Sequence, residues 1–203
     1  MRDRLNAALR RLPRGAVWVA GLIPFLLLAS DTLRGRLGVD PVRAIEHRSG
    51  RIAIYFLVAT LCVTPLLRLA RINAMRFRRA LGMLSFLYAA LHVAAWAVLD
   101  MGLAWGRIGG DLMNRPYLTI GAISGVILAL LAATASDLAI RRLGSARWRA
   151  IHRGIYVAAP LAGWHWLLVE KIPGPKEQAI LAVILGLLAW RGWVALRIER
   201  GIP

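Results

Sequence analysis

The sequence predicts an all-α membrane protein, a bundle of six transmembrane helices. Of the 203 residues 59% are hydrophobic, the mean hydropathy is +0.59, and long apolar runs recur about every thirty residues. Soluble domains contain only about 45–50% apolar residues. Little of the chain remains for a soluble domain, so residues 1–203 are expected to form a single membrane domain.

Six apolar segments are long enough for a helix to cross the hydrocarbon core, which takes about 20 residues. The sixth contains Arg191, a residue whose long side chain can reach the membrane surface from near a helix end. Between the spans we expect loops, including a charged outer loop over Arg34–Gly50 and an outer glycine-rich turn over Gly106–Gly110. The expected spans are Ala16–Leu33, Arg51–Ala70, Ala80–Leu99, Tyr117–Ala135, Ile151–Val169 and Ala179–Ile198.

The net charge of +17 comes from arginines that flank the apolar segments. This distribution is typical of membrane-flanking loops and excludes a nucleic-acid-binding domain. If the N-terminus is cytoplasmic, 18 basic residues fall on the inner side and nine on the outer side. The positive-inside rule therefore predicts that both termini are cytoplasmic.

Three histidines fall within the apolar segments, and an ionisable side chain inside a membrane indicates function. His92 and His165 lie roughly 20 and 24 Å from the inner edge of two parallel spans, so their rings can face one another. A neutral imidazole is also a common axial ligand of haem iron. His152 lies roughly 20 Å lower, near the cytoplasmic face. These depths predict that His92 and His165 hold one haem between them.

His152 and His165 are thirteen residues apart, which separates their directions by about 140° on a straight helix. Pro160 lies between them and is expected to kink the span and rotate its upper half. His152 is expected to serve the cytoplasmic side, as a ligand of a second haem or as a contact for an incoming flavin. His47, in the predicted outer loop, is expected to be solvated.

Several other residues have two interpretations. Trp164 and Trp166 flank His165 and can pack against a porphyrin or face lipid. The basic residues next to the histidine spans can anchor helix ends or pair with haem propionates; they are Arg78, Arg79 and Arg153.

Two functions fit these observations. One is a b-type cytochrome, and the other is a haem-free transporter or assembly scaffold with structural or proton-carrying histidines. Proton carriers usually pair histidine with intramembrane acids, whereas the acids here stand at span ends: Asp31, Asp100, Asp137 and Glu170. This favours the cytochrome. The chain has no dinucleotide fingerprint or P-loop. It therefore needs a separate electron donor and acceptor, and it has no complete catalytic site of its own.

Two histidine motifs resemble those of the MsrQ family. Arg78–Gly82, followed by Tyr88 and His92, is similar to that family's third span, and Trp148–Arg153 is similar to the start of its fifth. His165 matches the family's third histidine. Ser49–Arg51, leading to Thr64–Pro65, is similar to its second span. The resemblance covers essentially the whole chain, including its six-span plan.

The resemblance implies a ferric-reductase-like bundle that binds haem b in a bacterial inner membrane. A second haem is in doubt because Arg78 occupies the position, fourteen residues before His92, where larger relatives carry a fourth ligand. The resemblance also implies electrons from a cytoplasmic flavin reductase, with FMN implicated, or from the quinol pool. It implies as acceptor a periplasmic molybdopterin-containing methionine-sulfoxide reductase of the MsrP type, which repairs oxidised proteins.

Overall fold

The structure is a computed structural model that describes residues 1–169 and 172–199, which form helices joined by short connections. Glu170, expected at the end of the fifth span, lies outside the described residues. Two short segments, η1 and η2, are a 3₁₀-helix and a π-helix that continue into and out of α4. The elements are α1 (Arg2–Arg11), α2 (Gly15–Leu33), α3 (Pro41–Ala70), η1 (Met75–Phe77), α4 (Arg78–Ala94), η2 (Ala95–Asp100), α5 (Trp105–Asn114), α6 (Pro116–Ala133), α7 (Asp137–His152), α8 (Ile155–Val169) and α9 (Pro175–Glu199).

Five segments are long and apolar enough to cross a membrane: α2, α3, the continuous η1–α4–η2 segment, α6 and α9. The sixth predicted span corresponds to α8, which is apolar but has only 15 residues. It is therefore about 22 Å long, against a hydrocarbon core of about 30 Å. The prediction of an all-helical membrane bundle is confirmed, with one span shorter than expected.

The predicted outer loop over Arg34–Gly50 is wrong for its second half, because α3 already begins at Pro41. Asp40 caps this helix: its side chain accepts a hydrogen bond from the Arg43 N–H over 3.0 Å. Proline suits the first helical position, where an N–H has no helical acceptor. The charged first turns of α3 therefore extend the helix beyond its apolar part.

The predicted glycine-rich turn over Gly106–Gly110 is also wrong, because these residues belong to α5. Glycines lower the intrinsic helix propensity. This helix is nevertheless amphipathic, and it buries Ile108 against the bundle. Packing of one face compensates for weak propensity.

The fifth predicted span does not begin at Ile151, because a turn at Arg153–Gly154 interrupts the helix. The Gly154 N–H donates to the Ile151 carbonyl over 2.8 Å in the turn between α7 and α8. His152 is therefore the last residue of α7 and is not on the same helix as His165. Because this break puts the two histidines on different helices, the rotation expected at Pro160 is not what sets the angle between them.

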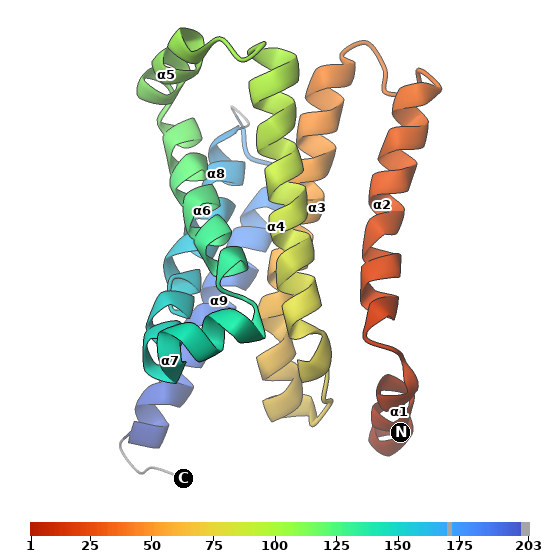
Figure 1. Ribbon diagram of the computed structural model, residues 1–203, viewed down its shortest axis with the longest axis vertical. Coiled ribbons are helices and arrows are strands. Elements are labelled where there is room, and N and C mark those ends of the chain that lie inside the picture. The colour runs from red at the N-terminus through yellow and green to blue at the C-terminus, as the bar shows by residue number, and fades with distance from the viewer. Residues whose placement is uncertain (170–171, 200–203) are drawn as a thin grey trace.

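The bundle has two distinct ends, which Figure 1 shows at its top and bottom. One carries α5 and the start of α3, and we call it the α5 end. The other carries α1, α7 and the last described turns of α9, and we call it the α7 end. The helices α3 and α6 run from the α5 end to the α7 end, and α4 and α8 run back.

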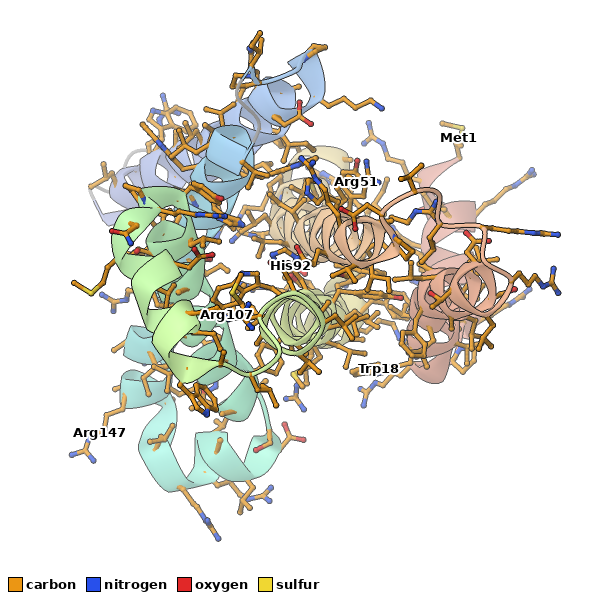
Figure 2. The ribbon with its side chains drawn as sticks, turned by 90° about the horizontal axis from the view of Figure 1, so that it is seen from above. Met1, Trp18, Arg51, His92, Arg107 and Arg147 are labelled. Carbon is orange, nitrogen blue, oxygen red and sulfur yellow. The ribbon has the colours of Figure 1, made fainter. Side chains whose placement is uncertain are left out.

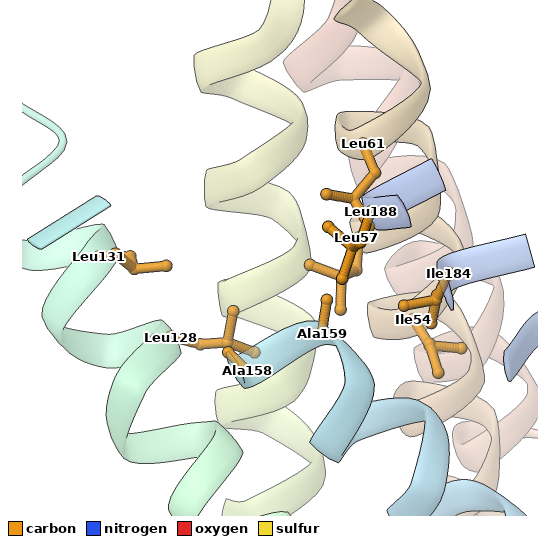
Figure 3. Close-up of a cluster of buried hydrophobic side chains, with 9 residues drawn as sticks. All are labelled: Ile54, Leu57, Leu61, Leu128, Leu131, Ala158, Ala159, Ile184 and Leu188. Carbon is orange, nitrogen blue, oxygen red and sulfur yellow. The ribbon is translucent and has the colours of Figure 1, made fainter. Parts of the chain in front are cut away.

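The largest apolar core lies where α3, α6, α8 and α9 meet (Figure 3). Ala158 and Ala159 are fully buried there, and their small side chains let α8 approach its neighbours closely. Arg191 of α9 is also buried, with 8% of its surface exposed, so its predicted extension to the membrane surface is wrong. The cluster consists of Ile54, Leu57, Leu61, Leu128, Leu131, Ala158, Ala159, Ile184 and Leu188.

Candidate cofactor site

A cavity of about 440 Å³ lies between α3, α4, α6 and α8, on the side of the core nearer the α5 end. This volume is within the range of small-molecule and cofactor sites, about 300–1,000 Å³. His92 of α4 and His165 of α8 both line it. Seen from above, His92 lies in the middle of the molecule, whereas Arg147 of α7 stands at its periphery (Figure 2).

The ring centres of His92 and His165 are 6.1 Å apart, with an angle of 64° between the ring planes. A metal–nitrogen bond to histidine is about 2.1 Å long, and the ring centre lies roughly 1 Å behind the bonding nitrogen. Two axial imidazoles on one metal ion therefore have centres roughly 6 Å apart. The spacing of the two rings matches that requirement.

The His92 ring is held by α3. Its Nδ1–H donates to the main-chain carbonyl of Glu46 over 2.9 Å, and the ring packs against Gly50, where an added Cβ would be 3.1 Å from Nδ1. Further along this pair of helices, the hydroxyl of Ser85 donates to the carbonyl of Ala53 over 2.9 Å. The α3–α4 pair thus fixes both the orientation and the tautomer of His92.

The His165 ring is held by α6 in the same way. Its Nδ1–H donates to the carbonyl of Tyr117 over 2.8 Å, and a Cβ at Gly121 would be 2.7 Å from Nδ1. The hydroxyl of Ser124 donates to the carbonyl of Ala158 over 2.8 Å. Only glycine lets the ring lie this close to the α6 backbone.

The two helix pairs share one register. In each pair, the carbonyl that accepts from the ring belongs to the residue four positions before the glycine. A serine–alanine hydrogen bond then joins the residue three positions after the glycine to the residue seven positions before the histidine. The serine is on the histidine helix in one pair and on the glycine helix in the other. The sequence contains no visible repeat, so this correspondence emerges only from the structure.

This arrangement suits a haem. Because each Nδ1 carries the proton, each Nε2 keeps its lone pair for a metal, and a backbone carbonyl behind the ring is the usual support of a metal-bound histidine. Two imidazoles are too few ligands for a bare ion, and over the described residues no group of three or more His, Cys, Asp and Glu side chains could hold one. A pair of opposed imidazoles fits a metal that brings its own equatorial macrocycle.

His152 is not part of this cavity. Its Nε2 lies 3.2 Å from the Thr134 hydroxyl, and its ring stacks on Trp148 at 4.1 Å between centres. Trp148 in turn donates its indole N–H to the Thr134 carbonyl over 2.9 Å. These contacts fasten the end of α7 to the end of α6. Burial lowers the pKa of His152, and the nearby Arg78 guanidinium lowers it further.

The arginines predicted to bind propionates are likewise outside the cavity lining. Arg79 forms an ion pair with Asp137 at 2.5 Å on the surface. Arg78 is half-buried and Arg153 is exposed, and all three lie at the α7 end.

The cavity is also lined by residues for which the sequence predicted another role or left two roles open. His47, expected to be solvated, lies on α3 and lines the cavity, where Arg43 donates to its Nε2 over 3.4 Å. Trp166 lines the cavity, whereas Trp164 is 51% exposed on the outside of the bundle. The contacts of Gly50 and Gly121 with the histidine rings could not be predicted from the sequence, where the two residues are simply glycines within apolar helices.

Comparison with known proteins gives a consistent result. Residues 49–163 match the model of a family described as the ferric reductase like transmembrane component. The chain is 40% identical over 189 residues to the protein-methionine-sulfoxide reductase heme-binding subunit MsrQ of Brucella ovis, covering 90% of this chain and 85% of the relative. The corresponding proteins of Brucella canis and Brucella suis match equally well. No solved structure matches the chain.

Proposed function

Because this chain belongs to the MsrQ family, within the ferric-reductase-like transmembrane group, we propose that it is a membrane cytochrome that carries electrons to a protein-methionine-sulfoxide reductase. All of residues 1–203 act as one membrane domain in this proposal. The chain is an electron-transfer subunit, and the reduction of the sulfoxide takes place on its partner.

In this proposal His92 and His165 are the axial ligands of one haem b. The observation that carries it is the pair of imidazoles 6.1 Å apart, each with its Nδ1–H bound to a main-chain carbonyl. Haem, when bound, supplies a one-electron couple whose potential depends on its axial ligands and their surroundings. Leu57 and Leu128 line the apolar part of the cavity and exclude water from it.

The charge distribution supports an orientation of the bundle in the membrane. We assign the α7 end to the cytoplasm, because the arginine-rich segments gather there. We propose that the bilayer is the inner membrane of a bacterium, as the family resemblance implies, with both termini cytoplasmic. The donor, a flavin reductase with FMN or a membrane quinol, delivers electrons at this end, where His152, Arg78, Arg79 and Arg153 lie.

The acceptor is proposed to meet the opposite, α5 end. The cavity lies nearer that end, which shortens the path from haem to partner. Reduction of one methionine sulfoxide to methionine consumes two electrons and two protons and releases water, so the cytochrome delivers two electrons in succession. The name of the relatives, heme-binding subunit of a protein-methionine-sulfoxide reductase, supports a partner of the MsrP type. We propose that this partner is the periplasmic molybdopterin enzyme that the family resemblance implies.

The test is the visible absorption spectrum of the purified protein, oxidised and reduced. We expect a low-spin b-type spectrum that is lost or converted in His92→Ala and His165→Ala. His152→Ala is the matched control and should keep it, because His152 lies outside the cavity. If both His92→Ala and His165→Ala fold and keep an unchanged spectrum, the ligand assignment is wrong.

A further inference from the structure

The two ends of the cavity differ in chemistry. On α3, Arg43, Glu46 and His47 come before Gly50, toward the α5 end, and Leu57 comes after it, toward the α7 end. The other helices follow the same order, with Asp100 and Arg115 on the α5 side of the histidines and Leu128 on the α7 side. The cavity therefore has a charged part toward the α5 end and an apolar part toward the core.

Three arginines line the charged part: Arg43 and Arg51 of α3, and Arg115 just before α6. Helical side chains lean toward the N-terminus, so Arg51 leans toward the α5 end. Arg115 is 3.3 Å from Asp111 in an ion pair whose arginine is exposed and whose aspartate is half-buried. Across residues 1–169 and 172–199, neither Arg43 nor Arg51 has a carboxylate within 4.0 Å. The Nε of Arg43 donates to His47 over 3.4 Å, so the terminal nitrogens of Arg43 and the guanidinium of Arg51 are the groups that can meet an incoming carboxylate.

Asp40, Glu46 and Asp100 line the same part of the cavity and offset the arginines. Glu46 Oε1 is buried and, among the described residues, has no hydrogen-bond partner. Because the net charge of this part is close to zero, it attracts a free anion only weakly. It suits carboxylates that belong to a larger ligand held by other contacts.

Among the described residues that line it, the apolar part of the cavity has no free hydrogen-bond donor for a carboxylate. Ser85 and Ser124 also line the cavity on this side of the histidines, and both hydroxyls already donate to main-chain carbonyls. Leu57 and Leu128 complete this side. A carboxylate placed there would lose its hydration without gaining a partner, which costs several kcal/mol or more.

We propose that Arg43, Arg51 and Arg115 bind the two propionates of the haem, so that its carboxylate edge faces the α5 end and its apolar edge faces Leu57 and Leu128. This inference rests on the proposed function, because it concerns a haem held by His92 and His165. It replaces the expectation that Arg78, Arg79 and Arg153 bind the propionates, since those residues lie at the α7 end.

The experiment compares haem b with its dimethyl ester, which lacks both carboxylate charges. Full-length protein produced without haem is loaded with either compound in detergent, and the loss of haem to excess apomyoglobin is followed. Arg43→Gln, Arg51→Gln and Arg115→Gln are each tested, with the conservative Arg43→Lys. Arg36→Gln is the matched control, because Arg36 is exposed at the α5 end and outside the cavity lining.

With haem b we expect at least one of Arg43→Gln and Arg51→Gln to lose haem about tenfold faster, as expected for loss of a charge-assisted hydrogen bond. Arg43→Lys should recover part of any loss seen in Arg43→Gln, and Arg36→Gln should behave as wild type. With the dimethyl ester, all variants should differ from wild type by less than about twofold.

Equal acceleration with both compounds, or no acceleration with either, overturns the inference. So does a selective loss of haem b in Arg78→Gln or Arg79→Gln. In each case an unchanged bis-histidine spectrum of the wild type leaves the proposed function standing. A wild type that takes up neither compound fails the proposed function itself, and the inference with it.

Discussion

The guanidinium of Arg191 in α9 donates a hydrogen bond over 2.7 Å to the main-chain carbonyl of Leu61 in α3. In a regular helix that carbonyl would accept from the residue four positions later, which is Pro65 and has no N–H. A carbonyl without a donor is costly inside a membrane, where water cannot replace the partner. The buried arginine therefore satisfies a carbonyl that the proline leaves free.

We predict that Arg191→Met destabilises the protein by about 1–3 kcal/mol, the cost of a buried carbonyl without a partner. In a Pro65→Ala background the same substitution should cost much less, because an alanine at that position restores the helical N–H donor. The measurement is unfolding in detergent for the two single variants and the double variant. Arg197→Met is the control, since Arg197 is exposed and packs on the Trp193 ring.

A second prediction concerns the glycines behind the histidines. Gly121→Ala should shift the midpoint potential and the low-spin signature of the haem, because its Cβ would lie 2.7 Å from His165 Nδ1 and displace the ring from the Tyr117 carbonyl. Loss of such a supporting contact typically costs about 10- to 100-fold in metal affinity. Gly50→Ala should have a smaller effect, since its Cβ would be 3.1 Å from His92 Nδ1.

Gly82→Ala is the matched control. Gly82 also lies where α4 meets α3, but a Cβ there would be at an ordinary 3.7 Å from Thr60. Alanine in a helix is otherwise favourable by roughly 0.5–1 kcal/mol relative to glycine. A potential that moves as much in Gly82→Ala as in Gly121→Ala would contradict the prediction.

The third prediction is a pH dependence at the α7 end. Burial lowers the pKa of His152 in the folded protein, so the unfolded chain binds the proton more readily. Stability should therefore be full above about pH 6.5, the value for an unfolded chain, and decline as the pH falls below it. The contribution of His152 to this slope is expected to stay below ~1.4 kcal/mol per pH unit, the ceiling for one proton.

The measurement is the thermal midpoint between pH 8 and pH 5.5 for wild type and His152→Gln. The variant should lose part of the acid sensitivity, and His47→Gln should keep it. An acid slope that His152→Gln leaves unchanged would show that the contact with Thr134 and Trp148 does not depend on the neutral ring.

The fourth prediction concerns orientation and the donor. Cysteines introduced in α1 and α7 of a Cys62→Ser protein should be labelled only from the cytoplasmic side. If a flavin reductase docks on the arginines of the α7 end, its rate of haem reduction should fall as salt rises, because screening weakens complementary charge. Labelling from the periplasm would reverse the topology. A rate indifferent to salt would argue against docking on this surface.

The helices were predictable because lipid makes hydropathy and length decisive. The pairing of His92 with His165 followed from depth alone, and the rings do lie 6.1 Å apart. The start of α3 was missed although Asp40–Pro41 is a helix-start signal, since the charged residues after it suggested a loop.

Other features depend on contacts between distant residues and left no pattern in the sequence. The closeness of Gly121 to the His165 ring is a property of how α6 and α8 cross. The break at Gly154 moved His152 out of the span, because a single turn ends a helix that hydropathy alone would continue.

The carbonyls of Glu46 and Tyr117 anchor the two rings, and in the proposed cytochrome they would do so at either charge of a metal bound between the rings. A ring fixed at Nδ1 and backed by a glycine has little freedom to move when an electron arrives or leaves. The nuclear rearrangement that accompanies oxidation and reduction is then small, and that rearrangement is what slows electron exchange. In the proposed function, the paired glycine–histidine helices therefore favour fast electron transfer through the haem site.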